Sequence, residues 1–112
     1  MTVADLCTLV EGSLLSPPAD DRQPVSSGYT CDLLSWVMAH GKPGMAWITV
    51  QTHLNVIAVA SLAEMSCIIL PENIQMEGAP LDKAGQEGIG IIASPLSAYE
   101  ICARMAAAGI PA

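Results

Sequence analysis

Charged side chains are scarce in this sequence of 112 residues, and basic ones are scarcer still. Only 13% of the residues are charged, against about 25% in an average soluble domain. Four Lys and Arg stand against 11 Asp and Glu, which gives a formal net charge of −7. A chain this acidic, without a patch of basic residues, repels a phosphate backbone. We therefore expect no nucleic-acid partner.

A run of apolar residues long enough to span a membrane is also lacking. The most apolar window, residues 56–70, contains Ser61, Glu64 and Ser66 and ends before a proline, short of the ~20 residues that a spanning helix needs. The first residues, MTVADLC, have neither the basic nor the apolar segment of a secretory signal. We expect a soluble, cytoplasmic protein without a membrane partner. Because 52% of the residues are hydrophobic, part of the apolar surface is expected to meet a partner.

Several catalytic and metal-binding signatures are missing. There is no CxxC pair, GxGxxG loop, Walker-type phosphate loop, HExxH or GxSxG. Isolated cysteines within apolar runs are typical of small buried hydrophobic residues, so we expect no metal, disulfide framework or cofactor. The four cysteines are Cys7, Cys31, Cys67 and Cys102. Without a phosphate loop the chain is not expected to be a kinase by itself.

The N-terminal third begins with a helix signal. Thr2 and Asp5 have the spacing of a capping box before a short amphipathic helix. A brief strand is predicted over residues 13–16, and three prolines favour an exposed loop over residues 17–24. Residues 25–31 contain Val, Tyr and Thr, which indicates an extended segment or strand.

The next segment is a helix followed by a buried strand. Asp32 is a plausible N-cap for a helix over residues 33–40, and Gly41 fits a left-handed position that ends the helix. Residues 45–50 are apolar without alternation, which suits a strand covered on both faces.

The most unusual segment is residues 54–65, which is apolar on nearly every side. Its polar residues are Asn55, Ser61 and Glu64. A helix with so narrow a polar stripe is either central or packed against another subunit. Since Lys42 is the only formally charged side chain between residues 33 and 63, we predict that this middle third supplies core and a homodimer interface.

The rest of the chain continues the alternation. A strand over residues 67–70, a helix over 80–87, a strand over 89–93 and a last helix capped by Ser97 are predicted. From residue 45 to 108 the order is strand, helix, strand, helix, strand, helix. We expect one α/β domain over residues 1–112, with a mostly parallel sheet, helices packed on it, and an extra N-terminal helix and edge strands.

Polar side chains follow two of the predicted strands. In a parallel sheet, ligands collect where strands end and helices begin, because the first N–H groups of each helix are free. Our hypothesis is that these polar residues bind a carboxylate or phosphate ligand. The alternative is that they only cap the two helices. The candidate residues are Gln51, Thr52, His53, Asn55, Ser94 and Ser97.

His53 is the one well-placed candidate for a general base. A base needs an orienting carboxylate or a nucleophile nearby, and only Asp32 or Cys31 would come close, if the preceding loop folds over the same edge. His40, in the last turn of its helix, is expected to complement the helix dipole. A small enzyme using His53 therefore stays the least favoured hypothesis.

A family resemblance covers residues 25–108. The run SGYTCDLLSWVMAHGKPGMAWITVQTHLNVIAVASL, then CIIL and IIASPLSAYEICARM, resembles the DRTGG domain. Such domains are similar to the N-terminal domain of HPr kinase/phosphorylase. They also occur in phosphotransacetylases, in pyrophosphatases with CBS domains, and as small proteins associated with iron hydrogenases. Where many relatives carry Gly-Gly-Asp-Arg after the corresponding strand, this sequence has Val50, Gln51, Thr52 and His53.

The resemblance implies an α/β accessory module at a homodimer interface, without catalysis of its own. We therefore expect a non-catalytic regulatory or assembly module that dimerises through an apolar surface and serves a metabolic or hydrogenase enzyme as partner. A small anionic ligand at the edge formed by residues 51–55 is compatible with this role. The alternative is a sensor for a nucleotide or another phosphate compound.

Overall fold

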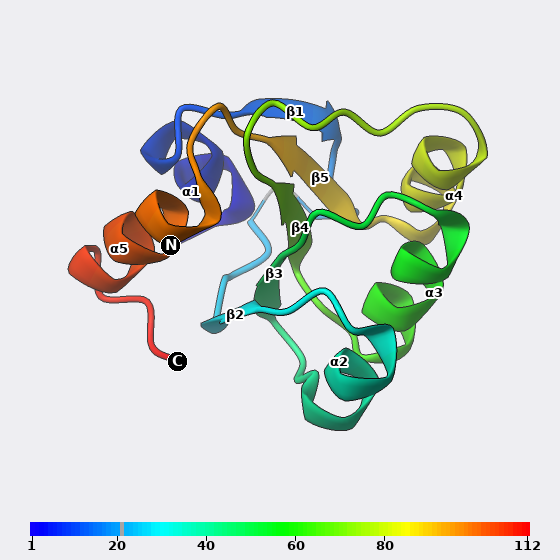
Figure 1. The fold of residues 1–112 in the computed structure, drawn as a ribbon, viewed down its shortest axis with the longest axis horizontal. Coiled ribbons are helices and arrows are strands. Elements are labelled where there is room, and N and C mark those ends of the chain that lie inside the picture. The colour runs from blue at the N-terminus through cyan, green and yellow to red at the C-terminus, as the bar shows by residue number, and fades with distance from the viewer. Residues whose placement is uncertain (21) are drawn as a thin grey trace.

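A five-stranded sheet runs through the middle of the computed structural model, which describes residues 1–20 and 22–112 (Figure 1). Its strand order is β1-β5-β4-β3-β2. The strands are β1 (Ser13–Ser16), β2 (Ser27–Thr30), β3 (Met45–Ile48), β4 (Cys67–Leu70) and β5 (Gly90–Ala93). The helices are α1 (Val3–Leu9), α2 (Leu34–His40), α3 (Leu54–Leu62), α4 (Ala79–Glu87) and α5 (Ala98–Ala107).

The strands β2, β3, β4 and β5 are parallel, and β1 pairs with β5 in the antiparallel direction. Every residue of β3, β4 and β5 is buried, which explains why these strands read as continuous apolar runs. The two N-terminal strands lie at opposite edges of the sheet. The mostly parallel α/β sheet with added edge strands is therefore confirmed.

Helices cover both faces of the sheet (Figure 1). One core forms between the sheet and α2, α3 and α4, with Trp47 and Ile68 at its centre. The other forms against α1 and α5 and includes Ile48 and Ile69. Successive residues of β3 and β4 thus serve opposite cores, because side chains alternate across a strand.

The predicted starts of α1, α4 and α5 are observed. The Thr2 hydroxyl accepts from the Asp5 N–H at 3.2 Å, and the Thr2 N–H donates to the Asp5 carboxylate at 3.0 Å. A proline lies in the first turn of α4, where a missing N–H costs nothing. The Ser97 hydroxyl accepts from the Glu100 N–H at 3.2 Å at the start of α5.

Two local predictions were wrong at α2. Its N-cap is Leu33, because the Asp32 carboxylate turns away to bind the end of β3. Gly41 is not left-handed, with φ −61° and ψ 141°. A side chain there is instead excluded by close packing, because a Cβ on Gly41 would lie 2.8 Å from the Met65 Cε and 2.9 Å from the Ala63 Cβ.

The central helix α3 is shorter than the predicted range 54–65. It ends at Leu62 because Glu64 adopts a left-handed conformation with φ 57°. The Met65 N–H then donates to the Ala60 carbonyl at 3.0 Å, and the Met65 side chain turns into the core. The helix remains apolar on nearly all sides, but only part of it is buried.

The proline-rich loop before β2 is mainly exposed, as predicted, although Pro18 is buried. Asp21, which belongs to the same predicted loop, lies outside the described residues. Within residues 1–20 and 22–112, no helix is both long and apolar enough to cross a membrane.

Candidate functional site

The turn between β3 and α3 is organised by a carboxylate from the neighbouring strand. Asp32 follows β2, and its Oδ1 accepts from the Thr49 hydroxyl at 2.8 Å and from the Val50 N–H at 2.9 Å. The Gln51 side-chain amide donates back to the Asp32 carbonyl at 3.0 Å. These bonds hold the ends of β2 and β3 together at the start of α3. Sequence reasoning missed this role of Asp32, whose only signal is a carboxylate at the end of a strand that lies beside β3.

The next residues of the turn are accessible. His53 is the N-cap of α3, but its side chain makes no capping hydrogen bond, and within the described residues its ring has no hydrogen-bond or ion-pair partner. The first N–H groups of α3 are therefore not covered by the cap side chain. Thr52 is half-buried beside it, and Asn55 is exposed on the side of α3 that faces α2.

The serines after β5 belong to different surroundings. Ser94 is fully buried, and its hydroxyl donates to the Val10 carbonyl at 2.7 Å and accepts from the Leu96 N–H at 3.2 Å. Ser97 is exposed and caps α5. Since β4 lies between β3 and β5, the residues that follow β4 separate these serines from the 51–55 turn.

Backbone bonds join the turn after β4 to the residues that follow β5. The Glu72 N–H donates to the Leu96 carbonyl at 2.8 Å, and the Asn73 N–H donates to the Ser94 carbonyl at 2.9 Å. Gln51, Thr52 and His53 therefore share one turn and Ser94 and Ser97 another, with the residue 72–73 turn between them.

Three of the four thiols are poorly suited to nucleophilic chemistry. Burial raises the pKa of Cys67 to about 12 and raises the pKa of Cys7 and Cys102 as well. A thiol with a raised pKa supplies little thiolate near neutral pH. Across the described part of the chain, no group of three His, Cys, Asp or Glu side chains is arranged to hold a metal ion.

Two of the basic side chains are already paired with carboxylates. Lys83 lies 3.0 Å from Glu87 within α4, and this hydrogen bond lowers the pKa of the Glu87 carboxyl. Arg104 lies 2.8 Å from Glu11 and 3.1 Å from Glu100. Both cations therefore serve to offset neighbouring acids, and neither lies in the 51–55 turn.

An apolar surface extends over α2 and α3. Met38 is 58% exposed, Leu54 48% and Leu62 76%. A groove of about 360 Å³ runs between the two helices. We call this surface the α2–α3 face; the groove is lined by Leu34, Met38, Asn55, Ala58, Val59 and Leu62. This face belongs to the middle third of the sequence, for which a homodimer interface is predicted.

Comparison with known proteins identifies the fold. No family model matches the chain, and no curated protein matches it either. Its structure is similar to the crystal structure of the CBS and DRTGG domains of the regulatory region of Clostridium perfringens pyrophosphatase, in complex with the activator diadenosine tetraphosphate. The TM-score is 0.77 at 9% identity, over 93% of this chain and 45% of that chain. The chain thus has the DRTGG-like α/β fold that its sequence blocks predict.

Proposed function

We propose that this chain is a non-catalytic regulatory or assembly module that forms a homodimer through the α2–α3 face. The observation that carries the proposal is the exposed stripe Leu54, Ala58 and Leu62 on α3. Residues four apart lie on the same side of a helix, so these three side chains form one ridge. An exposed apolar ridge of this kind is the usual sign of a protein interface.

The spacing of the ridge is self-complementary. Ala58 lies four residues from Leu54 and four from Leu62, so a two-fold axis through Ala58 places Leu54 of one copy beside Leu62 of the other. A two-fold interface requires this reciprocity, because the same patch serves both copies. The small side chain of Ala58 at the centre lets two helices approach closely, and packing of the i±4 ridges is common between helices.

The charge distribution favours a second copy over a charged partner at this face. Each chain carries a formal charge of −7, and copies in contact repel one another unless the contact surface is neutral. Residues 33–63 contain a single formal charge, on the exposed Lys42. The groove of the α2–α3 face therefore carries no formal charge. The carboxylates of Glu64 and Glu87 lie at its border beside Leu62, together with the cation of Lys83.

A dimer interface of ordinary size would cover only a small part of this chain's surface. A specific interface buries about 800 Å² on each partner, which is roughly one seventh of the 5569 Å² surface of this chain. The groove between α2 and α3 and the smaller hollow beside Gly41 and Ala63 adjoin the ridge and enlarge the contact.

The regulatory assignment rests on the similarity of the fold to a pyrophosphatase regulatory region. The raised pKa values of three thiols and the isolated position of His53 are in keeping with a module that lacks catalysis of its own. We propose that the dimer serves an enzyme partner, as the family resemblance implies.

Cross-linking at the proposed two-fold axis tests the dimer. Helix axes 8–10 Å apart leave roughly 3.5–5.5 Å between facing Cα atoms, which overlaps the range a disulfide needs. We expect Ala58→Cys to form a covalent dimer on mild oxidation, while the unaltered chain and Ala103→Cys on the exposed side of α5 do not. Light scattering of the unaltered chain should give the mass of a dimer. A monomer at micromolar concentration, with no excess cross-linking of Ala58→Cys, would contradict the proposal.

A second candidate function is a sensor for a nucleotide or another phosphate compound. The solved neighbour was crystallised with diadenosine tetraphosphate, and the uncapped start of α3 beside His53 and Asn55 offers free N–H groups to an anion. A thermal-shift series with diadenosine tetraphosphate, ATP and inorganic phosphate tests this candidate. Stabilisation that disappears in His53→Ala and Asn55→Ala supports it, and an unchanged melting temperature throughout counts against it.

A further inference from the structure

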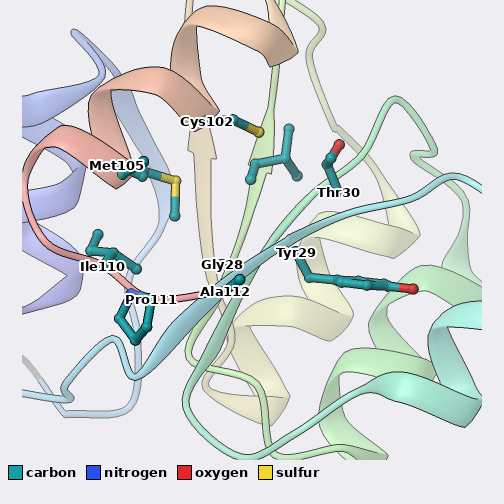
Figure 2. A pocket seen from close by; sticks show the side chains of 10 residues that line it. Gly28, Tyr29, Thr30, Cys102, Met105, Ile110, Pro111 and Ala112 are labelled. Carbon is teal, nitrogen blue, oxygen red and sulfur yellow. The ribbon is translucent and has the colours of Figure 1, made fainter.

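A cavity of about 330 Å³ lies on the opposite side of the sheet from the α2–α3 face. It opens between the edge strand β2, the last turns of α5 and the chain segment after α5 (Figure 2). Figure 2 shows Cys102 and Met105 extending from α5 toward β2, with Ile110 beside them. Its volume falls in the range of about 300–1,000 Å³ that is usual for small-molecule sites.

A glycine in β2 lets α5 pack closely on the strand beside the cavity. Gly28 lies under Met105, and a Cβ on Gly28 would be 2.9 Å from the Met105 Cε. The Gly28 N–H donates to the Pro111 carbonyl at 2.9 Å. This bond fixes the segment after α5 against the sheet edge, so the segment forms a wall of the cavity.

The lining selects against charge. None of the lining residues has a charged side chain, and most are apolar: Gly28, Tyr29, Thr30, Ile48, Cys102, Met105, Ala106, Ile110, Pro111 and Ala112. Burial raises the pKa of Cys102, which keeps this thiol neutral near pH 7. An anionic ligand would lose part of its hydration here without gaining an opposite charge.

Polar groups of Thr30 lie at the end of the cavity. The Cys31 N–H donates to the Ile48 carbonyl of β3 at 3.3 Å, so the backbone of Thr30 faces the free edge of the sheet, as that of Gly28 does. The Thr30 side chain is exposed and lines the cavity. Its hydroxyl can donate one hydrogen bond and accept others, which suits a ligand with one polar group.

We propose that this cavity binds an uncharged small molecule with a largely apolar ring system and one hydroxyl or carbonyl group, which bonds to Thr30. The ring lies between β2 and α5, against Ile48 and Met105. Because the cavity and the α2–α3 face are on opposite sides of the sheet, the ligand and a second copy of the chain use separate surfaces.

The test uses 1-naphthol as the probe and 1-naphthyl phosphate as its charged counterpart. We expect the unaltered chain to bind 1-naphthol at one saturable site in a calorimetric or fluorescence titration and to bind the phosphate much more weakly. In NMR spectra, the amide shifts of residues 28–30 and 102–106 should move on adding 1-naphthol, while those of α3 stay in place. No saturable binding, equal binding of the phosphate, or shifts centred on another part of the chain would overturn the proposal.

Two variants and a matched control locate the site. Ala106→Phe places a ring into the cavity from an exposed position of α5. Excluding two carbon atoms of the probe weakens binding roughly tenfold. Ala107→Phe, at the next exposed position and outside the lining, should bind as the unaltered chain does.

Thr30→Val tests the hydrogen bond to the ligand. It keeps the side-chain shape and removes the hydroxyl, which should weaken binding roughly two- to tenfold. Equal affinities of Ala106→Phe and Ala107→Phe would contradict the assignment.

Discussion

Replacing Leu62 by Ala tests the proposed dimer most directly. Leu62 is 76% exposed at the end of α3, so the isolated chain gains little from its side chain. In the proposed dimer it packs beside Leu54 of the second copy. The substitution should therefore weaken association and leave the free energy of unfolding of the monomer within about 0.5 kcal/mol of its original value.

The size of the effect follows from the area that dimerisation buries. Burying a whole Leu side chain contributes about 1.5–3 kcal/mol. Because 76% of Leu62 remains exposed in the single chain, docking adds about 1–2 kcal/mol per copy, and the two-fold axis doubles the sum. Alanine retains the Cβ, so the loss is about 2–3 kcal/mol per dimer. The dissociation constant should rise roughly 30- to 150-fold.

Sedimentation velocity over a dilution series measures this change, with Tyr99→Ala as the matched control. Tyr99 is 85% exposed on α5, on the opposite side of the sheet. Its removal takes away at least as much apolar surface without touching the α2–α3 face. Equal dissociation constants for the two variants, or a weaker dimer for Tyr99→Ala alone, would refute the assignment of the interface.

Three further predictions concern the fold. Asp32→Ala leaves the hydroxyl of Thr49 without its acceptor, and Thr49 is only 1% exposed. Urea titration should show that the free energy of unfolding falls by about 1–3 kcal/mol. The loss should be smaller for Asp32→Asn. Gly41→Ala places a Cβ 2.9 Å from the Ala63 Cβ, which cannot turn aside. The same titration should show a loss of about 1–3 kcal/mol, and unchanged stability would contradict the packing. The hydrogen bond from the N-cap N–H of α1 lowers the pKa of Asp5. A carboxyl whose pKa is lower in the folded chain than in the unfolded chain stabilises the folded state at pH values above its unfolded pKa. This contribution is lost as the pH falls through the folded pKa. As the pH is lowered below about 4, the melting temperature should therefore fall more steeply for the unaltered chain than for Asp5→Asn. Parallel curves of melting temperature against pH would contradict this.

The α/β alternation could be predicted from the sequence because it depends on local features. The apolar runs of β3, β4 and β5 reflect strands buried on both faces. The capping box of α1, the Ser97 cap of α5 and the proline of α4 act within one helical turn. We predicted that β1 is an edge strand because the N-terminal third lacks the strand–helix alternation of the later residues. The sequence did not indicate which strand β1 pairs with.

Features that depend on contacts between residues far apart in the sequence could not be predicted. Asp32 has the local pattern of an N-cap, but its carboxylate binds Thr49, 17 residues further along. Ser94 looks like a helix-start donor, yet its hydroxyl reaches Val10, 84 residues away. The cavity beside β2 requires α5 and the segment after it to pack on a strand some 75 residues earlier, and no local pattern marks that arrangement.

The antiparallel pairing of β1 with β5 also sets an order of events during synthesis. Ser13 lies opposite Ala93, and Arg104 donates to the Leu9 carbonyl at 3.2 Å. The segment formed by α1 and β1 is synthesised before β5, yet its place in the sheet is created only when β5 has been made. Contacts this far apart in sequence slow folding. The segment formed by α1 and β1 must therefore wait, with its apolar face uncovered, until β5 has been translated.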